Sequence, residues 1–101
     1  MFATVRRYAG LSDLTAAALI DRAADVAIVL ASVPGARGSH LIRTREGVIL
    51  VTVGTDESCL AESGRRFRAW VDAHVREFRA ADEADVWVGV VVHQDLGAGT
   101  S

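Results

Sequence analysis

The chain has 101 residues and a formal net charge of −2; half of its residues are hydrophobic and 24% are charged. This length fits one domain, and the composition is that of a globular protein, which excludes a disordered or fibrous chain. The net charge argues against nucleic acid as a partner, because nucleic-acid-binding domains are usually clearly basic. The single cysteine excludes an internal disulfide bond and a cysteine-based zinc site.

No segment of the sequence predicts membrane insertion or secretion. The longest apolar run, residues 23–33, contains Asp25 and is far shorter than the roughly 20 residues that span a bilayer. Arg6 and Arg7 near the N-terminus are not followed by an apolar run. We therefore expect a cytoplasmic protein without a membrane partner. All 11 basic residues are arginine and asparagine is absent, a composition typical of GC-rich bacterial genomes.

The first predicted element is a strand over residues 2–8, rich in β-branched and aromatic side chains and followed by Gly10. Ser12 is a candidate N-cap for an alanine-rich helix that extends to about residue 32. Apolar residues recur along this helix at intervals of three or four, which predicts one buried stripe. The stripe consists of Leu19, Ala23, Val26, Leu30 and Val33.

Pro34 and Gly35 end that helix, and Gly38 indicates a loop or a β-bulge. Two apolar segments follow, 39–44 and 48–53, and their short glycine-containing connection predicts a hairpin. Thr55 or Asp56 is expected to cap a second helix that runs to about Arg79. A valine-rich strand over 86–93 comes next, and residues 96–101 form a tail that we expect to be flexible.

The predicted order is strand, helix, strand, strand, helix, strand. This order is typical of the ferredoxin-like βαββαβ fold, an α+β arrangement with a four-stranded antiparallel sheet and two helices on one face. We expect residues 1–95 to form this one domain.

The last two predicted strands are apolar on both faces. Val48 and Leu50 alternate with Ile49, Val51 and Val53, and the final strand likewise carries apolar side chains on both sides. A sheet face that meets water should instead alternate apolar and polar residues. We therefore expect a homodimer in which the open sheet faces of two copies pack together. The alternatives are more extensive coverage by the helices and tail, or a different protein partner.

Four segments carry a resemblance to a known family. They are ATVRRY at the start, VPGARGSHLI over 33–42, GVILVTVGTDES over 47–58 and the closing valine strand. Together they resemble the dimeric α+β barrel superfamily, in particular antibiotic-biosynthesis-monooxygenase-type domains. The resemblance implies a homodimeric barrel with a small-molecule pocket between sheet and helices in each protomer.

Members of that superfamily include cofactor-free monooxygenases acting on polycyclic aromatic phenols, and haem-degrading enzymes. Their best-known members use a pocket asparagine together with Trp, Tyr, Arg or His. Because this chain has no asparagine, neither residue set carries over complete.

The residues that could form such a site lie on the second helix and the first strand. Trp70 and His74 are one helical turn apart, and Arg6 and Tyr8 share one face of the strand. We predict that Trp70, Arg6 and Phe67 contact a planar substrate, and that His74 or Tyr8 handles a proton. A haem-ligand role for His74 is a further alternative. In the structural interpretation, Trp70 is a core residue and His74 lies at the boundary of the core.

Other candidate sites are weaker. His40 and His93 lie on strands, and the three histidines show no metal-ligand spacing, so we expect no metal and no cofactor. Cys59 is interpreted as a small apolar side chain. Arginines on the outer face of the second helix are interpreted as solvated.

Two functions remain open: a cofactor-independent monooxygenase acting on an aromatic or quinol-like substrate, and a non-catalytic homodimeric ligand-binding or structural module.

Overall fold

The computed structural model describes residues 1–75 and 83–92 of the chain. Its elements, in chain order, are β1 (Phe2–Ala9), α1 (Asp13–Asp21), α2 (Ala23–Ala31), β2 (Ala36–Arg43), β3 (Gly47–Gly54), α3 (Glu57–His74) and β4 (Glu83–Val90).

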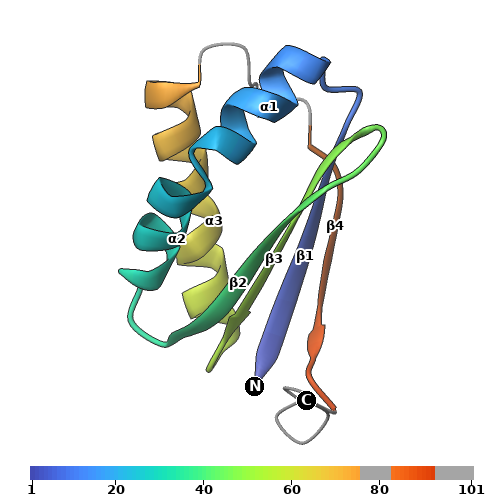
Figure 1. Ribbon diagram of the computed structural model, residues 1–101. Helices are drawn as coiled ribbons and strands as arrows, with labels where there is room; N and C mark the ends of the chain where they lie inside the picture. Colours follow the sequence, from blue (N-terminus) through green and yellow to red (C-terminus); the bar gives the residue numbers. More distant parts are fainter. Residues whose placement is uncertain (76–82, 93–101) are drawn as a thin grey trace, which may run out of the picture.

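The four strands form one antiparallel sheet in the order β2-β3-β1-β4. All three helices lie on the same side of this sheet, as Figure 1 shows, and they leave the other side open. The predicted α+β, ferredoxin-like fold is therefore confirmed. Because β1 and β3 are the two central strands, their helix-facing side chains lie in the middle of the domain.

The first predicted helix is divided in two, which corrects the expectation of two helices. Arg22 has φ −105° and ψ 18°, outside the helical range, and separates α1 from α2. The predicted apolar stripe nevertheless holds across the break, because Leu19, Val26 and Leu30 are all buried. Three helices rather than two thus cover one face of the sheet.

Side-chain hydrogen bonds cap the N-termini of α1 and α3. The Ser12 hydroxyl accepts a hydrogen bond from the Thr15 amide at 3.1 Å, as expected for the predicted N-cap of α1. Of the two predicted caps for the last helix, Asp56 is the one used: its carboxylate accepts a hydrogen bond from the Cys59 amide at 2.7 Å.

Several predicted boundaries shift. β2 begins at Ala36 instead of residue 39, since the chain enters the sheet through an irregularity between Ala36 and Gly38, the position predicted to be a loop or bulge. β4 covers 83–90 instead of 86–93. α3 ends at His74, with Val75 as its C-cap, and not at Arg79. The predicted helical positions 76–79, His93 and the predicted tail lie outside the described residues.

The core lies between the helices and the centre of the sheet. Leu50, Val48 and Thr4 point from the strands toward the helices and are almost completely buried. From the helices, Leu19, Phe67 and Val71 meet them with at most 1% of their surface exposed.

The opposite face of the sheet is predominantly apolar, and none of the helices that the structure describes covers it. It carries Val5 on β1 and the alternate residues Ile49, Val51 and Val53 on β3, with Trp87 on β4 54% exposed. An ion pair between Arg7 and Asp85 crosses from β1 to β4 on this face. Among the described residues, no helix combines the length and the apolar character that crossing a bilayer requires.

Candidate functional site

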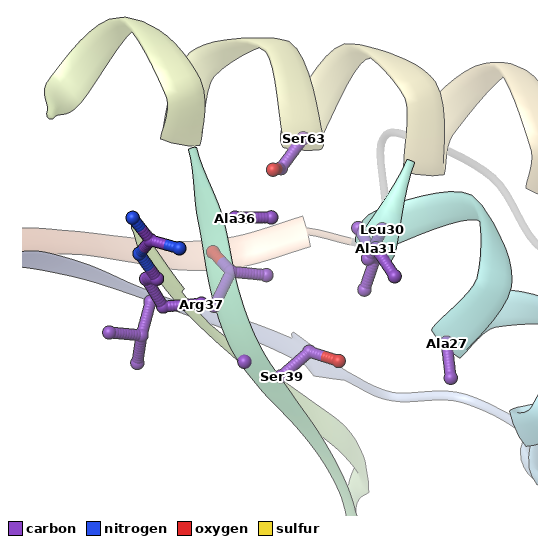
Figure 2. Close-up of a pocket in the computed structure, with 10 residues that line it drawn as sticks. Ala27, Leu30, Ala31, Ala36, Arg37, Ser39 and Ser63 are labelled. Carbon is purple, nitrogen blue, oxygen red and sulfur yellow. The ribbon is translucent and has the colours of Figure 1, made fainter. Parts of the chain in front are cut away.

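A cavity of about 180 Å³ lies where α2 and α3 meet the edge of the sheet formed by β2 and β3. We call it the α2–β2 cavity. Figure 2 shows Ser63 reaching down from α3, small side chains of α2 on one flank and residues of β2 on the other. The lining residues are Ala27, Leu30, Ala31, Ala36, Arg37, Gly38, Ser39, Thr52, Val53 and Ser63.

A β-bulge shapes the β2 side of this cavity. Ala36 pairs with Gly54 and Gly38 pairs with Val53, so Arg37 is an extra residue without a cross-strand partner. Such bulges bend a strand and redirect a side chain, and they occur often beside functional sites. Here the bulge places Arg37 at the end of the cavity opposite Ala27 (Figure 2).

Two hydroxyl groups lie next to each other on the strands that line the cavity. Ser39 on β2 and Thr52 on β3 are direct cross-strand partners. Facing residues in such a pair have Cβ atoms roughly 4.5–5.5 Å apart. Neither side chain has a hydrogen bond to another of the described residues, so both hydroxyls can donate to a ligand.

Ser63 adds a third hydroxyl from the helix side. This side chain is 2% exposed and donates a hydrogen bond to the Cys59 carbonyl at 3.0 Å. Since its proton is engaged in α3, the Ser63 oxygen can serve a ligand only as an acceptor. The cavity thus offers donors from the strands and an acceptor from the helix.

Among the described residues that line the cavity, Arg37 is the one that carries a charge. It forms no ion pair within the part of the chain that the structure describes. A guanidinium keeps its charge at every accessible pH. The cavity therefore has one positively charged end, a polar strip along the strands and an apolar wall of Ala27, Leu30 and Ala31 from α2.

The predicted site residues on β1 and α3 lie elsewhere. Tyr8 and Phe67 are 4% and 1% exposed and belong to the core, where their ring centroids are 5.9 Å apart. Neither lines the α2–β2 cavity. The proton-transfer role predicted for Tyr8 and the substrate contact predicted for Phe67 stay predictions.

Trp70 and His74 form a pair of their own at the C-terminal end of α3. Their rings are stacked, with centroids 4.9 Å apart and planes 18° from parallel. The His74 Nδ1 atom lies 2.9 Å from the Trp70 carbonyl oxygen, within hydrogen-bond distance of a helix C-terminal acceptor. Trp70 also packs partly against the core, whereas His74 is exposed.

Arg6 lies beneath the middle of α3, beside an open hollow of about 400 Å³. A side chain at Gly64 would meet the Arg6 guanidinium, so the glycine permits this close approach. The hollow also contains Arg65, Arg68 and Asp72 from the exposed face of α3. The five predicted site residues are therefore divided between the core, the end of α3 and this hollow.

The remaining candidates show no metal or nucleophile arrangement. Among residues 1–75 and 83–92, no three His, Cys, Asp or Glu side chains are grouped as metal ligands. His40 is exposed on β2, and Cys59 is buried with a free thiol. The α2–β2 cavity could not be predicted from the sequence, because its alanine, serine and threonine residues have no distinctive spacing. Gly38, which predicts a loop or a β-bulge, is the one sequence signal that lies beside this cavity.

Comparison with solved structures supports the fold. One of the solved structures that superpose on the chain is Rv0793 from Mycobacterium tuberculosis, with a TM-score of 0.66 and 19% identity, covering 92% of this chain and 96% of that one. Another is a mutant of SnoaB, a cofactor-independent oxygenase from Streptomyces nogalater, with a TM-score of 0.64 and 18% identity, covering 92% and 94% of the two chains. A protein from Nitrosomonas europaea described as an antibiotic biosynthesis monooxygenase has a TM-score of 0.63 and 13% identity, covering 92% and 100%. No protein-family model and no curated protein matches the sequence. The resemblance proposed from the sequence is thus confirmed at the level of the fold.

Proposed function

We propose that this protein is a homodimer in which each protomer binds a small organic molecule in the α2–β2 cavity. The observation that carries the proposal is the cavity itself, with its apolar wall on α2 facing a polar strip on β2 and β3. Small-molecule sites typically combine an apolar lining with a few well-placed polar groups in this way.

The volume limits the size of the ligand. A cavity of about 180 Å³ is smaller than the roughly 300–1,000 Å³ of pockets that hold drug-sized molecules. An engineered apolar cavity of about 150 Å³ in another protein accommodates benzene. The α2–β2 cavity therefore suits a single ring or a short branched chain, and an aromatic ligand of this size agrees with the sequence-based expectation.

The homodimer is supported by the open sheet face. Val51 lies on this face of a central strand, and Val5 and Trp87 extend the apolar surface across β1 to the edge strand β4. Contiguous apolar surface of this kind on a soluble protein usually marks an interface. A second copy packed sheet to sheet would remove it from water on both protomers at once.

A second candidate function is a cofactor-independent monooxygenase acting on an aromatic or quinol-like substrate. The likeness to SnoaB, a cofactor-independent oxygenase, favours it. Without a cofactor, the electrons that reduce O₂ come from the substrate's anion, so a side chain must first accept the substrate's proton. His74 and Tyr8 are the predicted acceptors, and neither lines the α2–β2 cavity. For this reason ligand binding is the function that the geometry supports best.

Blocking the cavity tests the first proposal. Ala31→Leu enlarges an exposed side chain of α2 that lines the cavity, whereas Ala24→Leu makes the same change at an exposed position of α2 away from it. Binding of benzamide, followed by amide NMR shifts of the intact protein, should be lost in Ala31→Leu and kept in Ala24→Leu. Equal binding by both variants would place the ligand elsewhere.

Oxygen consumption tests the second candidate. The wild-type protein is mixed with one-ring and two-ring hydroquinones, and O₂ uptake is compared with that of His74→Ala and Tyr8→Phe. Uptake that depends on either residue would establish the oxygenase. O₂ uptake no faster than that of the hydroquinones without protein would refute the oxygenase and favour the ligand-binding function.

A further inference from the structure

We propose that the α2–β2 cavity is specific for small carboxylates, and that Arg37 is the residue that selects them. This inference rests on the proposed ligand-binding function and assigns the chemical class of the ligand. It follows from three features of the cavity: the position of Arg37 in the strand, the hydroxyl pair beside it and the apolar wall opposite.

The β-bulge leaves Arg37 without a cross-strand partner at the start of β2. In an uninterrupted ladder, residue 37 would pair with Gly54 and share the helix-facing side of Ser39 and Leu41. Instead Arg37 is the inserted residue, and residues Ser39 and Leu41 resume the helix-facing register beyond it. The exposed Arg37 side chain lies at one end of the cavity (Figure 2).

The charge at this end is not neutralised by the cavity. The other described residues of the lining carry no carboxylate, and Arg37 makes no ion pair with any described residue. A guanidinium presents two parallel N–H donors that match the two oxygens of a carboxylate. An anionic group of the ligand is therefore the partner that this end of the cavity recognises.

The hydroxyls of Ser39 and Thr52 continue the polar strip from Arg37 along the strands. Both can donate to a ligand oxygen, in contrast to Ser63, whose proton is bound to the Cys59 carbonyl. A carboxylate held by Arg37 can accept from Ser39 as well, and a hydroxyl substituent farther along the ligand can donate to Ser63.

The body of the ligand faces α2. Ala27, Leu30 and Ala31 offer hydrocarbon surface without polar side-chain atoms. Together with a volume of about 180 Å³, this wall accommodates one ring or a branched chain of similar size. The ligand class is a monocarboxylate with a compact apolar body, such as a substituted benzoate.

Benzoate and benzamide serve as probes, since they share shape and size and differ in charge at pH 7. Their affinities for the dimeric wild-type protein are measured by amide NMR titration. We expect benzoate to bind about 10-fold more tightly, the typical gain from a charge-assisted pair over a neutral hydrogen bond. Arg37→Gln should remove this preference by weakening benzoate alone, and Arg37→Lys should retain part of it.

The control is Arg45→Gln, which removes one positive charge from an exposed position that does not line the cavity. It should leave the benzoate preference unchanged. Equal affinity of wild-type protein for both probes, or equal weakening by Arg45→Gln and Arg37→Gln, would overturn the assignment of Arg37. If neither probe shifts the amide NMR signals of cavity residues, the proposed ligand-binding function itself fails. If both probes bind with equal affinity, only the carboxylate specificity is refuted.

Discussion

The phenol ring of Tyr8 packs on the ring of Phe67, with centroids 5.9 Å apart and planes inclined by 41°. Tyr8 comes from the helix-facing side of the central strand β1, next to Val48 on β3, and Phe67 comes from the middle of α3. The pair therefore connects the longest helix to the centre of the sheet. Two residues that the sequence suggested for substrate chemistry form a main packing contact of the domain.

Replacing Phe67 tests this packing role. Phe67→Ala should lower the free energy of unfolding by about 3–5 kcal/mol, because it removes a fully buried ring and leaves a cavity. Urea unfolding followed by circular dichroism measures the change. Leu14→Ala, at a residue 82% exposed on α1, should change the same quantity by less than about 0.5 kcal/mol. A loss of similar size for both variants would contradict the core position of Phe67.

A charged substitution at the centre of the open sheet face tests whether this face forms the dimer interface. Val51→Asp would place an unpaired carboxylate in the proposed dimer interface, and we expect the dimer dissociation constant to rise by about 100-fold or more. Native mass spectrometry reports the subunit count and any co-purified small molecule. Ile28→Asp, at a residue 68% exposed on the helix side, should leave the dimer intact. An equally stable dimer of the Val51 variant would exclude sheet-to-sheet packing.

Because Asp56 caps α3 through its carboxylate, we expect the free energy of unfolding to decrease at low pH. The Cys59 amide and the Ser58 hydroxyl donate hydrogen bonds to the Asp56 carboxylate, and these lower the pKa of Asp56. The unfolded chain, with a pKa of about 4 for this carboxyl, binds the proton first as the pH falls. The stabilisation by Asp56 is thus complete above about pH 4 and is lost as the pH falls through the lowered pKa of the folded state.

Asp56→Asn keeps an oxygen acceptor for the cap but cannot titrate in this range. The slope of unfolding free energy against pH, measured by urea titration between about pH 2 and 5, should become shallower in this variant. Asp21→Asn removes a carboxylate at an exposed position of α1 and serves as the control. An identical slope for wild type and Asp56→Asn would refute the role of this cap in acid stability.

The turn before β2 requires glycine for two separable reasons. Gly35 has φ +91°, and an added Cβ would lie 2.6 Å from Thr55 Oγ1. Gly10 has φ +75° with nothing within 4 Å of an added Cβ. Gly10→Ala therefore measures the cost of the left-handed backbone alone, about 1 kcal/mol. Gly35→Ala should cost clearly more in urea unfolding, and equal losses would show that Thr55 moves aside freely.

Local signals predicted much of the fold because they act over a few residues. Ser12 caps its helix as expected, and Pro34 and Gly35 separate the helical region from β2. The break at Arg22 had no such signal, since the surrounding alanine-rich sequence favours a continuous helix. The early start of β2 at Ala36 depends on the bulge, which only pairing with β3 defines.

For the candidate site, the amino-acid sequence establishes which chemical groups are available: no asparagine, three histidines, few aromatic residues and an apolar strand pattern that predicts a covered sheet face. How these groups are distributed in space follows only from the folded chain. Arg6, Tyr8 and Trp70 are close in type to a catalytic set, yet they contact Gly64, Phe67 and His74 respectively. Arg37 and Ser63 are 26 positions apart and lack a motif, but line one cavity because strand pairing and helix packing bring distant segments together. Periodicity and caps are properties of neighbouring residues, whereas a cavity is made by side chains whose proximity exists only in the folded chain.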